Sequence, residues 1–169
     1  MPTLKYFDRE QLLRWMKGNK EAVEFIDLAC DIAHVWDDLV DQDKEIEVDD
    51  INRIFFNSLV RLPRNPFYRK NFDHLNSVMM NSISNWQIAT KLEREGGDYE
   101  TSIAFVLRSS YVDLITQAAM LCGGGKWACK VGEEARRLTH EETYEGYLKN
   151  LDKEKRDREQ LVSEKVRKK

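Results

Sequence analysis

The chain has 169 residues, of which 34% are charged, yet its formal net charge is only −3. This length suits one domain with a real hydrophobic core, and the near balance of charge argues against a protein built around nucleic acid. No run approaches the ~20 apolar residues of a membrane span, and the N-terminus lacks the apolar segment of a signal peptide. The three unpatterned cysteines favour a reducing cytoplasm.

Helical periodicity runs through most of the chain, and no strand pair is evident. Asp8 and Asn19 are suited to cap the first two helices, because short polar side chains accept hydrogen bonds from free backbone N–H groups. Pro63 and Pro66 are expected to stop the third helix. We expect about six to seven helices, in chain order over about 8–17, 19–41, 49–62, 71–95, 99–122, 126–138 and from a Thr139–Glu142 capping box onward.

Short turns marked by glycine or proline join these helices. This pattern predicts an all-α fold, an antiparallel helical bundle over 1–148. The segment 149–169 is rich in Lys, Glu, Asp and Arg and poor in apolar residues. We expect it to be either a solvated helix or disordered until bound, and to offer a docking segment for a protein partner.

The helix expected over 19–41 carries an ionisable stripe along one face. Its members follow spacings of three and four and fall within roughly 100° of the helix surface. Most of the remaining surface is apolar, which inverts the usual amphipathic helix. We therefore expect a buried helix whose stripe lines an internal cleft, where repelling carboxylates need cations. The stripe consists of Glu24, Asp27, Asp31, His34, Asp38 and Asp41.

The sequence Asp37-Asp38-Leu39-Val40-Asp41 matches the pattern D-D-x-x-D at the end of this helix. Its carboxylates converge, and hard cations such as Mg²⁺ prefer oxygen ligands and often retain substrate phosphates. A metal held in this way can clamp a diphosphate and neutralise the charge that develops as it leaves. We predict that Asp37, Asp38 and Asp41 bind Mg²⁺ together with a diphosphate-containing small molecule.

The block 33–41 resembles the first aspartate-rich motif of class I isoprenoid synthases, which are also helical bundles. The resemblance covers some ten residues. It implies a bundle that is isoprenoid-synthase-like in its central helices, with the aspartates of 37–41 binding Mg²⁺ and the substrate diphosphate. The family's second metal motif, N-x-x-S-x-x-x-E, begins at Asn81 and Ser84 but has Ile88 in place of the acid.

The segments 15–19, 34–43 and 62–68 resemble small uncharacterised helical proteins encoded by tailed bacteriophages. This resemblance implies a viral protein of the host cytoplasm or of the virion, and it brings no activity with it. The alternative function is accordingly non-enzymatic, a virion component or a host-directed binder. In that case the acidic stripe is a structural ion-pair network.

Four cations are candidates for phosphate binding, because arginine binds oxyanions bidentately. Arg64, Arg69 and Lys70 belong to a basic, aromatic turn, whose alternative role is an exposed loop packed through its aromatic rings. Arg108 lies in an apolar segment, where a charge needs a carboxylate partner. An ion pair with the acidic stripe is the alternative for Arg108.

Several polar side chains of the later helices are expected to form one network across the bundle axis, because buried polar groups need hydrogen bonds. They are His74, Asn81, Asn85, Asp113 and Gln117. His34 is either a core histidine bonded to a carboxylate or a site residue. The aromatic residues Trp36, Trp86, Phe55 and Phe56 are expected in the core.

Two other metal sites stay open. Asp31-x-x-His34 resembles half of the carboxylate-x-x-His pair that di-iron bundles use twice. Glu21-x-x-Glu24 followed by Asp38-x-x-Asp41 resembles the two acidic pairs with which helical nucleotide pyrophosphatases bind Mg²⁺, although those pairs normally lie on separate helices.

Overall fold

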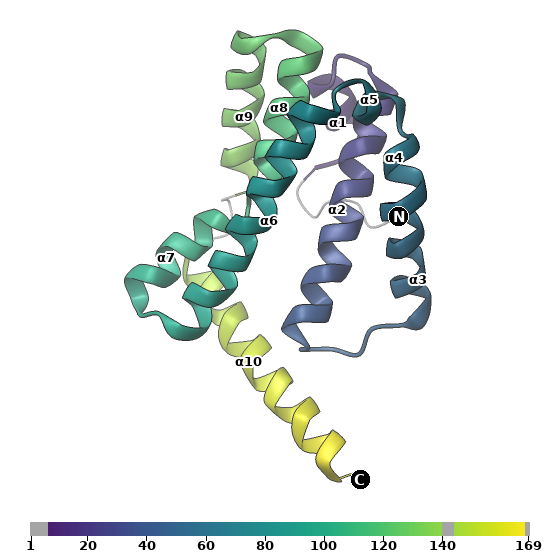
Figure 1. Cartoon of the computed structure of the whole chain (residues 1–169). Helices are drawn as coiled ribbons and strands as arrows, with labels where there is room; N and C mark the ends of the chain where they lie inside the picture. Colours follow the sequence, from purple (N-terminus) through teal and green to yellow (C-terminus); the bar gives the residue numbers. More distant parts are fainter. Residues whose placement is uncertain (1–6, 140–143, 168–169) are drawn as a thin grey trace.

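The computed structural model describes residues 7–139 and 144–167, and every regular element within these ranges is helical (Figure 1). The predicted all-α fold is confirmed for these ranges. None of the helices in them combines the length and the apolar character that crossing a membrane requires.

The first two helices form as their caps predict. α1 covers Arg9–Trp15, and Asp8 Oδ1 accepts a hydrogen bond from Gln11 N over 2.7 Å. α2 covers Lys20–Asp41, and Asn19 Oδ1 accepts from Ala22 N over 3.1 Å. These short-range bonds satisfy N–H groups that the helix itself leaves without partners.

The prediction that Pro63 stops the third helix is wrong. α3 (Val48–Phe56) continues without a break into a π-helical segment, η1 (Asn57–Arg61), and then into α4 (Leu62–Arg64). Pro63 is the second residue of α4, which follows the π-helical segment directly, so the α-helical hydrogen-bond pattern is already interrupted there. The chain turns only at Asn65, whose backbone is extended before Pro66 at the start of α5 (Pro66–Lys70).

The second half of the chain contains the helices α6 to α10. The single helix expected over 99–122 is wrong, because it is broken by a turn over 108–110. In that turn the Ser109 and Ser110 hydroxyls donate to the carbonyls of Val106 and Leu107, over 2.8 and 2.7 Å, and so compete with the helical ladder. The elements are α6 (Phe72–Glu95), α7 (Asp98–Leu107), α8 (Tyr111–Gly123), α9 (Gly125–Thr139) and α10 (Tyr144–Arg167).

The charged segment after residue 148 belongs to α10, so its described part is helical. The expected capping box at Thr139 includes Glu142, which lies outside the described residues. Figure 1 shows α10 passing beneath the body from the end of α7, with the C-terminal end of the helix projecting away.

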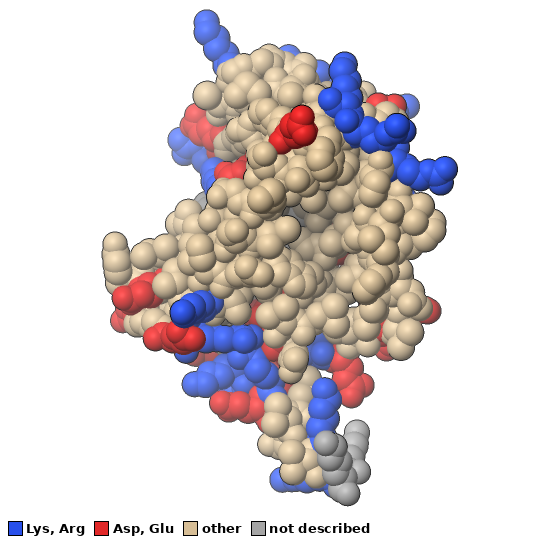
Figure 2. Space-filling view, viewed as in Figure 1, with Lys and Arg blue, Asp and Glu red and all other residues tan. Residues whose placement is uncertain are grey.

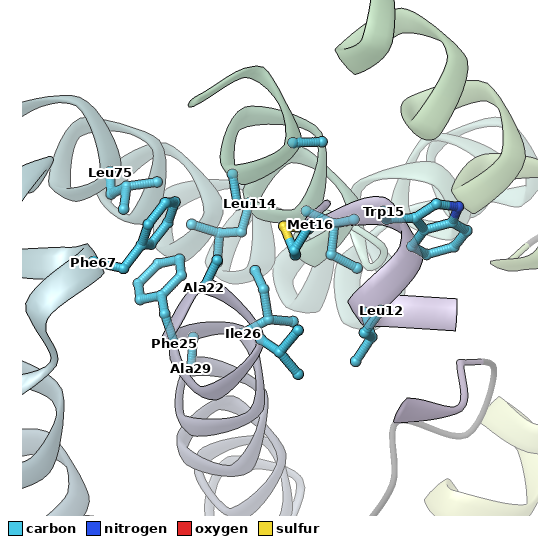
Figure 3. Close-up of a cluster of buried hydrophobic side chains, with 14 of the residues drawn as sticks. Leu12, Trp15, Met16, Ala22, Phe25, Ile26, Ala29, Phe67, Leu75 and Leu114 are labelled. Carbon is cyan, nitrogen blue, oxygen red and sulfur yellow. The ribbon is translucent and has the colours of Figure 1, made fainter. Parts of the chain in front are cut away.

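The core lies where the first half of α2 meets α1, α5, α6 and α8. Figure 3 shows Phe25 and Ile26 of α2 pointing among the side chains of these helices. Trp15, Phe25 and Leu75 are fully buried. The C-terminal half of α2 has fewer buried residues than the N-terminal half. The space between this half of α2 and α6 is not part of the buried core described above.

The prediction that Phe55 and Phe56 belong to the core is wrong. They are 62% and 57% exposed on α3. Together with η1 and α4, this helix forms an outer arm of the molecule over 48–64 (Figure 1). The helical spacing of these residues gave no indication that α3 packs through so little of its surface, since its buried residue is Ile54.

Candidate functional site

An apolar pocket of about 310 Å³ opens between α2, the η1–α4 arm, α6 and the start of α8. Ala29, Ala33 and Trp36 of α2 line it on one side at helical spacing, and Ile83 and Trp86 of α6 line it on another. Figure 2 shows a hollow between these elements, on a face where few charged side chains lie. The side chains of Ala29 and Ala33 are small, so they leave room that larger side chains would fill.

Two tryptophans close the lower end of the pocket. The rings of Trp36 and Trp86 pack with their centroids 4.1 Å apart and an angle of 40° between their planes. Both are only partly buried, so the expectation that they are core residues is met only in part. Both side chains line the cavity.

The polar groups that line the pocket are engaged within the protein. The hydroxyls of Ser58, Ser82 and Ser110 donate to the backbone carbonyls of residues 54, 110 and 107, over 2.6, 3.2 and 2.7 Å. Arg108, the one charged residue among the described residues that line the pocket, is bound by carboxylates. The remaining surface is almost entirely carbon. Such a pocket suits a molecule that needs no hydrogen bonds.

A hydrogen-bond network lies directly behind the tryptophans. Arg108 binds Glu93 through Nε and one terminal nitrogen, and its other terminal nitrogen donates to Asp37 Oδ1 over 2.9 Å. Trp86 Nε1 donates to the same Asp37 oxygen over 2.7 Å. The Tyr147 hydroxyl, from α10, donates to Glu93. This chain of bonds therefore joins α10 to the pocket wall.

Burial raises the pKa of two groups in this network. It raises the pKa of Asp37, although Arg108 and the Trp86 N–H oppose the shift. The pKa of the Tyr147 phenol is also raised, first by burial and then by its hydrogen bond to Glu93. The Glu93 side chain is 7% exposed and the Arg108 side chain 18%, so their ion pair is largely shielded from water.

A second cluster of acidic side chains, which includes Asp41 and Glu154, lies where α10 passes the end of α2. Burial and the neighbouring Asp37 raise the pKa of Asp41 to about 6. Burial and the carboxylates of Asp41 and Asp43 raise the pKa of Glu154 to about 7. Arg158 of α10 donates its Nε–H to the backbone carbonyl of Asp41 over 2.7 Å and so anchors the helix at this place.

The acidic stripe of α2 does not face the pocket. The carboxylates pair individually with cations from four different segments of the chain, over 2.8 to 3.4 Å. The pairs are Glu24 with Arg61, Asp27 with Arg9, Asp31 with Arg53 and Asp38 with Lys44. Asp31 also accepts a hydrogen bond from Asn57 over 2.8 Å. The exposed His34 lies 3.8 Å from Asp38.

The three predicted metal ligands turn toward different partners. Asp37 binds Arg108, Asp38 binds Lys44 over 2.8 Å, and Asp41 lies 3.7 Å from Arg94. Within the ranges that the structure describes, no three His, Cys, Asp or Glu side chains are grouped to hold a metal ion. Metal binding by these aspartates stays a prediction.

The predicted phosphate-binding cations lie at two ends of α2. Arg64, Arg69 and Lys70 are exposed around α5, which is tied to the start of α2 by a 3.0 Å bond from Asn65 Nδ2 to the Glu21 carbonyl. Arg108 instead meets Asp37, some 24 Å further along the helix at 1.5 Å per residue. The four cations therefore do not form one site in this structure.

The polar residues of the later helices form separate pairs. His74 Nε2 lies 2.7 Å from Gln117 Oε1, and Arg136 donates to Asp113 over 2.8 Å. Asn85 donates to the Ser110 hydroxyl over 3.2 Å, beside the pocket, while Asn81 is exposed. One continuous network across the bundle axis, as expected from the sequence, is not formed by these residues.

Sequence reasoning missed Glu93, Tyr147, Glu154 and Arg158. Glu93 stands in a charged run before two glycines, which is typical of a solvated helix end. The one available signal was the spacing of Tyr147, Leu151, Glu154 and Arg158, which places them on one face of a helix.

A scan against protein-family models, a search of curated proteins and a search of solved structures each returned no match to this chain.

Proposed function

We propose that this protein binds a small, neutral, apolar molecule in the pocket between α2 and α6. The observation that carries the proposal is the lining itself, which is almost all carbon, with its polar groups engaged within the protein. The volume of about 310 Å³ falls at the lower end of the range of about 300–1,000 Å³ for ligand pockets. A cavity of about 150 Å³ holds benzene. Twice that volume suits a ligand of about twelve carbon atoms or slightly more.

The test is a fluorescence titration with N-phenyl-1-naphthylamine, a neutral aromatic probe that brightens in apolar surroundings. We expect saturable binding, accompanied by a change in the emission of Trp36 and Trp86. Ala33→Phe places a large ring at a position that lines the pocket and should abolish binding. Ser84→Phe places the same ring on an exposed position of α6 that does not line the pocket, and should leave binding unchanged. Equal binding by both variants would place the probe elsewhere and contradict the proposal.

A second candidate is Mg²⁺-dependent binding or turnover of a diphosphate carried on an apolar chain, as the isoprenoid-synthase-like motif implies. It is supported by the position of Asp37, which is bonded to two residues that line the pocket, Trp86 and Arg108. An apolar chain in the pocket would bring its head group to the D-D-x-x-D segment. Mg²⁺ would then compete with Arg108 and Lys44 for the carboxylates.

Thermal unfolding with Mg²⁺ or Mn²⁺, with and without pyrophosphate, tests this candidate. A ligand at 100 times its Kd stabilises the native state by about 2.7 kcal/mol. We expect a metal-dependent rise in Tm that pyrophosphate enlarges and Asp38→Ala removes. Without such a rise, the ion pairs along α2 support the other expectation, a structural network in a non-enzymatic protein.

A further inference from the structure

α10 reaches two distant parts of the molecule. Near its start, the Tyr147 ring packs against Phe105 of α7 with centroids 4.9 Å apart, and the hydroxyl binds Glu93 of α6. Eleven residues later, about 16 Å along the helix, Arg158 binds the end of α2. α10 therefore bridges α6 and the end of α2, and Figure 1 shows it running below these two helices.

The first of these contacts continues into the pocket wall. Tyr147 donates to Glu93, and Glu93 fixes the plane of the Arg108 guanidinium through two of its nitrogens. The third nitrogen holds Asp37, which holds the Trp86 indole. Arg108 also lies over the Trp86 ring, 5.0 Å from its centroid. Each member of this chain has its orientation set by the one before it.

Release of α10 would remove one donor from Glu93 and expose the Glu93–Arg108 pair to water. A charged pair is held less firmly in water than in a shielded site, because the interaction is weaker at high dielectric. Arg108 and Asp37 would then orient Trp86 less strictly, and the closed end of the pocket would loosen. A molecule packed against Trp86 favours the ordered arrangement and hence the docked helix.

We propose that docking of α10 and occupancy of the pocket are positively coupled through Tyr147, Glu93, Arg108, Asp37 and Trp86. This inference rests on the proposed apolar-ligand function and adds its regulation. Coupling between two sites is reciprocal, so the ligand must strengthen docking by the same factor by which docking strengthens the ligand. Any partner that captures α10 would then weaken ligand binding.

The test compares two tyrosines of the same helix. Tyr147→Phe keeps the ring and removes only the hydroxyl that binds Glu93. Tyr144→Phe removes a hydroxyl that donates to the Asp98 carbonyl over 3.0 Å, outside the chain of bonds. We measure the Kd of N-phenyl-1-naphthylamine by fluorescence, and the hydrogen exchange of α10 amides with and without the probe, in the full chain.

We expect Tyr147→Phe to raise the Kd about fivefold, the lower end of typical coupling factors, and Tyr144→Phe to leave it unchanged. The probe should slow exchange over 147–161 in the wild type and less so in Tyr147→Phe. Equal Kd values for the wild type and Tyr147→Phe would overturn the coupling and leave the proposed function intact. Probe binding to the wild type without any change in the hydrogen exchange of α10 amides would do the same. Absence of probe binding to the wild type would overturn both.

Discussion

Trp86 of α6 donates its indole N–H to Asp37 of α2 across 2.7 Å, which joins the two helices at the closed end of the apolar pocket. The same carboxylate oxygen receives Arg108. A residue that the sequence pattern assigned to metal binding thus has a clear structural role, that of holding an aromatic wall in place. Its neighbours allow several measurements that separate structural from functional roles.

Loss of Arg108 should be among the most damaging single changes in the protein. Arg108→Met leaves Glu93, whose side chain is 7% exposed, without its cation. Breaking a buried ion pair from one side typically costs about 3–5 kcal/mol. We expect the free energy of unfolding in urea to fall by that amount.

Arg137→Met is the matched control, because the 78% exposed Arg137 side chain pairs with the 66% exposed Glu133 side chain at the surface. Ion pairs of this kind contribute about 0–1 kcal/mol. The double variant Arg108→Met with Glu93→Gln should recover part of the lost stability, since no charge is then left alone at Glu93. No difference in stability between Arg108→Met and Arg137→Met would contradict the shielded position of Glu93.

Stability should increase as the pH is lowered through the neutral range. Asp41 and Glu154 have folded pKa values of about 6 and about 7, raised by burial and neighbouring carboxylates above their ordinary values of 3.8 and 4.5. Between the ordinary and the raised values, the native state binds more protons than the unfolded state. Its stability therefore falls as the pH rises through this window. Urea unfolding at pH 5, 6, 7 and 8 measures the slope.

Glu154→Gln removes one of the two groups and should flatten the curve between about pH 5 and pH 7, the region in which Glu154 changes charge. Glu159→Gln, at an exposed position of the same helix, should leave the curve unaltered. An identical slope in wild type and Glu154→Gln would mean that α10 does not bring this carboxylate to Asp41.

Gly132 permits the close packing of α9 against α8. A Cβ at this position would lie 2.8 Å from the Thr116 Oγ1, which itself donates to the Val112 carbonyl. Gly132→Ala is expected to cost about 1–3 kcal/mol, as overpacking typically does, despite the better helix propensity of alanine. A calorimetric scan should show a Tm lower by several degrees.

Thr116→Ala removes the opposing atoms and should restore most of the stability of Gly132→Ala. Gly125→Ala serves as a control, because its nearest atom, Met120 Sδ, is 3.9 Å away. If Thr116→Ala adds its own loss without any rescue, the two helices are further apart than described.

The three cysteines should react with an aromatic disulfide reagent at very different rates. Burial, with the nearby carboxylates of Asp27 and Asp31, raises the pKa of the Cys30 thiol to about 12, whereas Cys129 is exposed. Since the thiolate is the reactive form, Cys129 should react first and Cys30 last. Cys30 lines the pocket, so saturating N-phenyl-1-naphthylamine should slow it further. A fast phase that survives in Cys129→Ser would contradict this order.

The sequence predicted those parts of the fold that depend on neighbours along the chain. Asp8 and Asn19 cap their helices through bonds to residues three positions away, so a short window of sequence contains the whole interaction. An ion pair of Arg108 with the acidic stripe was one of two alternatives, because a charge among apolar residues needs a partner; Arg108 instead pairs with Asp37, which lies on the same helix outside the stripe, and with Glu93.

What the sequence could not show depends on which faces meet in space. Phe55 looks like a core residue by its type, but the arm that carries it packs on one side only. The pocket arises because Ala29 and Ala33 are small beside a tryptophan pair contributed by α2 and α6, and no local sequence pattern predicts such a cavity. Glu93 is important through Arg108 and Tyr147, which lie 15 and 54 positions away in the chain.

The π-helical segment Asn57–Arg61 sets which face of α4 is turned toward the pocket. The Leu62 N–H reaches back five residues to the Asn57 carbonyl, so one residue more than an α-helix requires is accommodated there. Deleting that one residue would rotate α4 by about 100° relative to α3. The arm would remain helical, but Ser58 and Leu62 would no longer share the face that borders the pocket. The length of this arm, counted in single residues, is therefore as constrained as its composition.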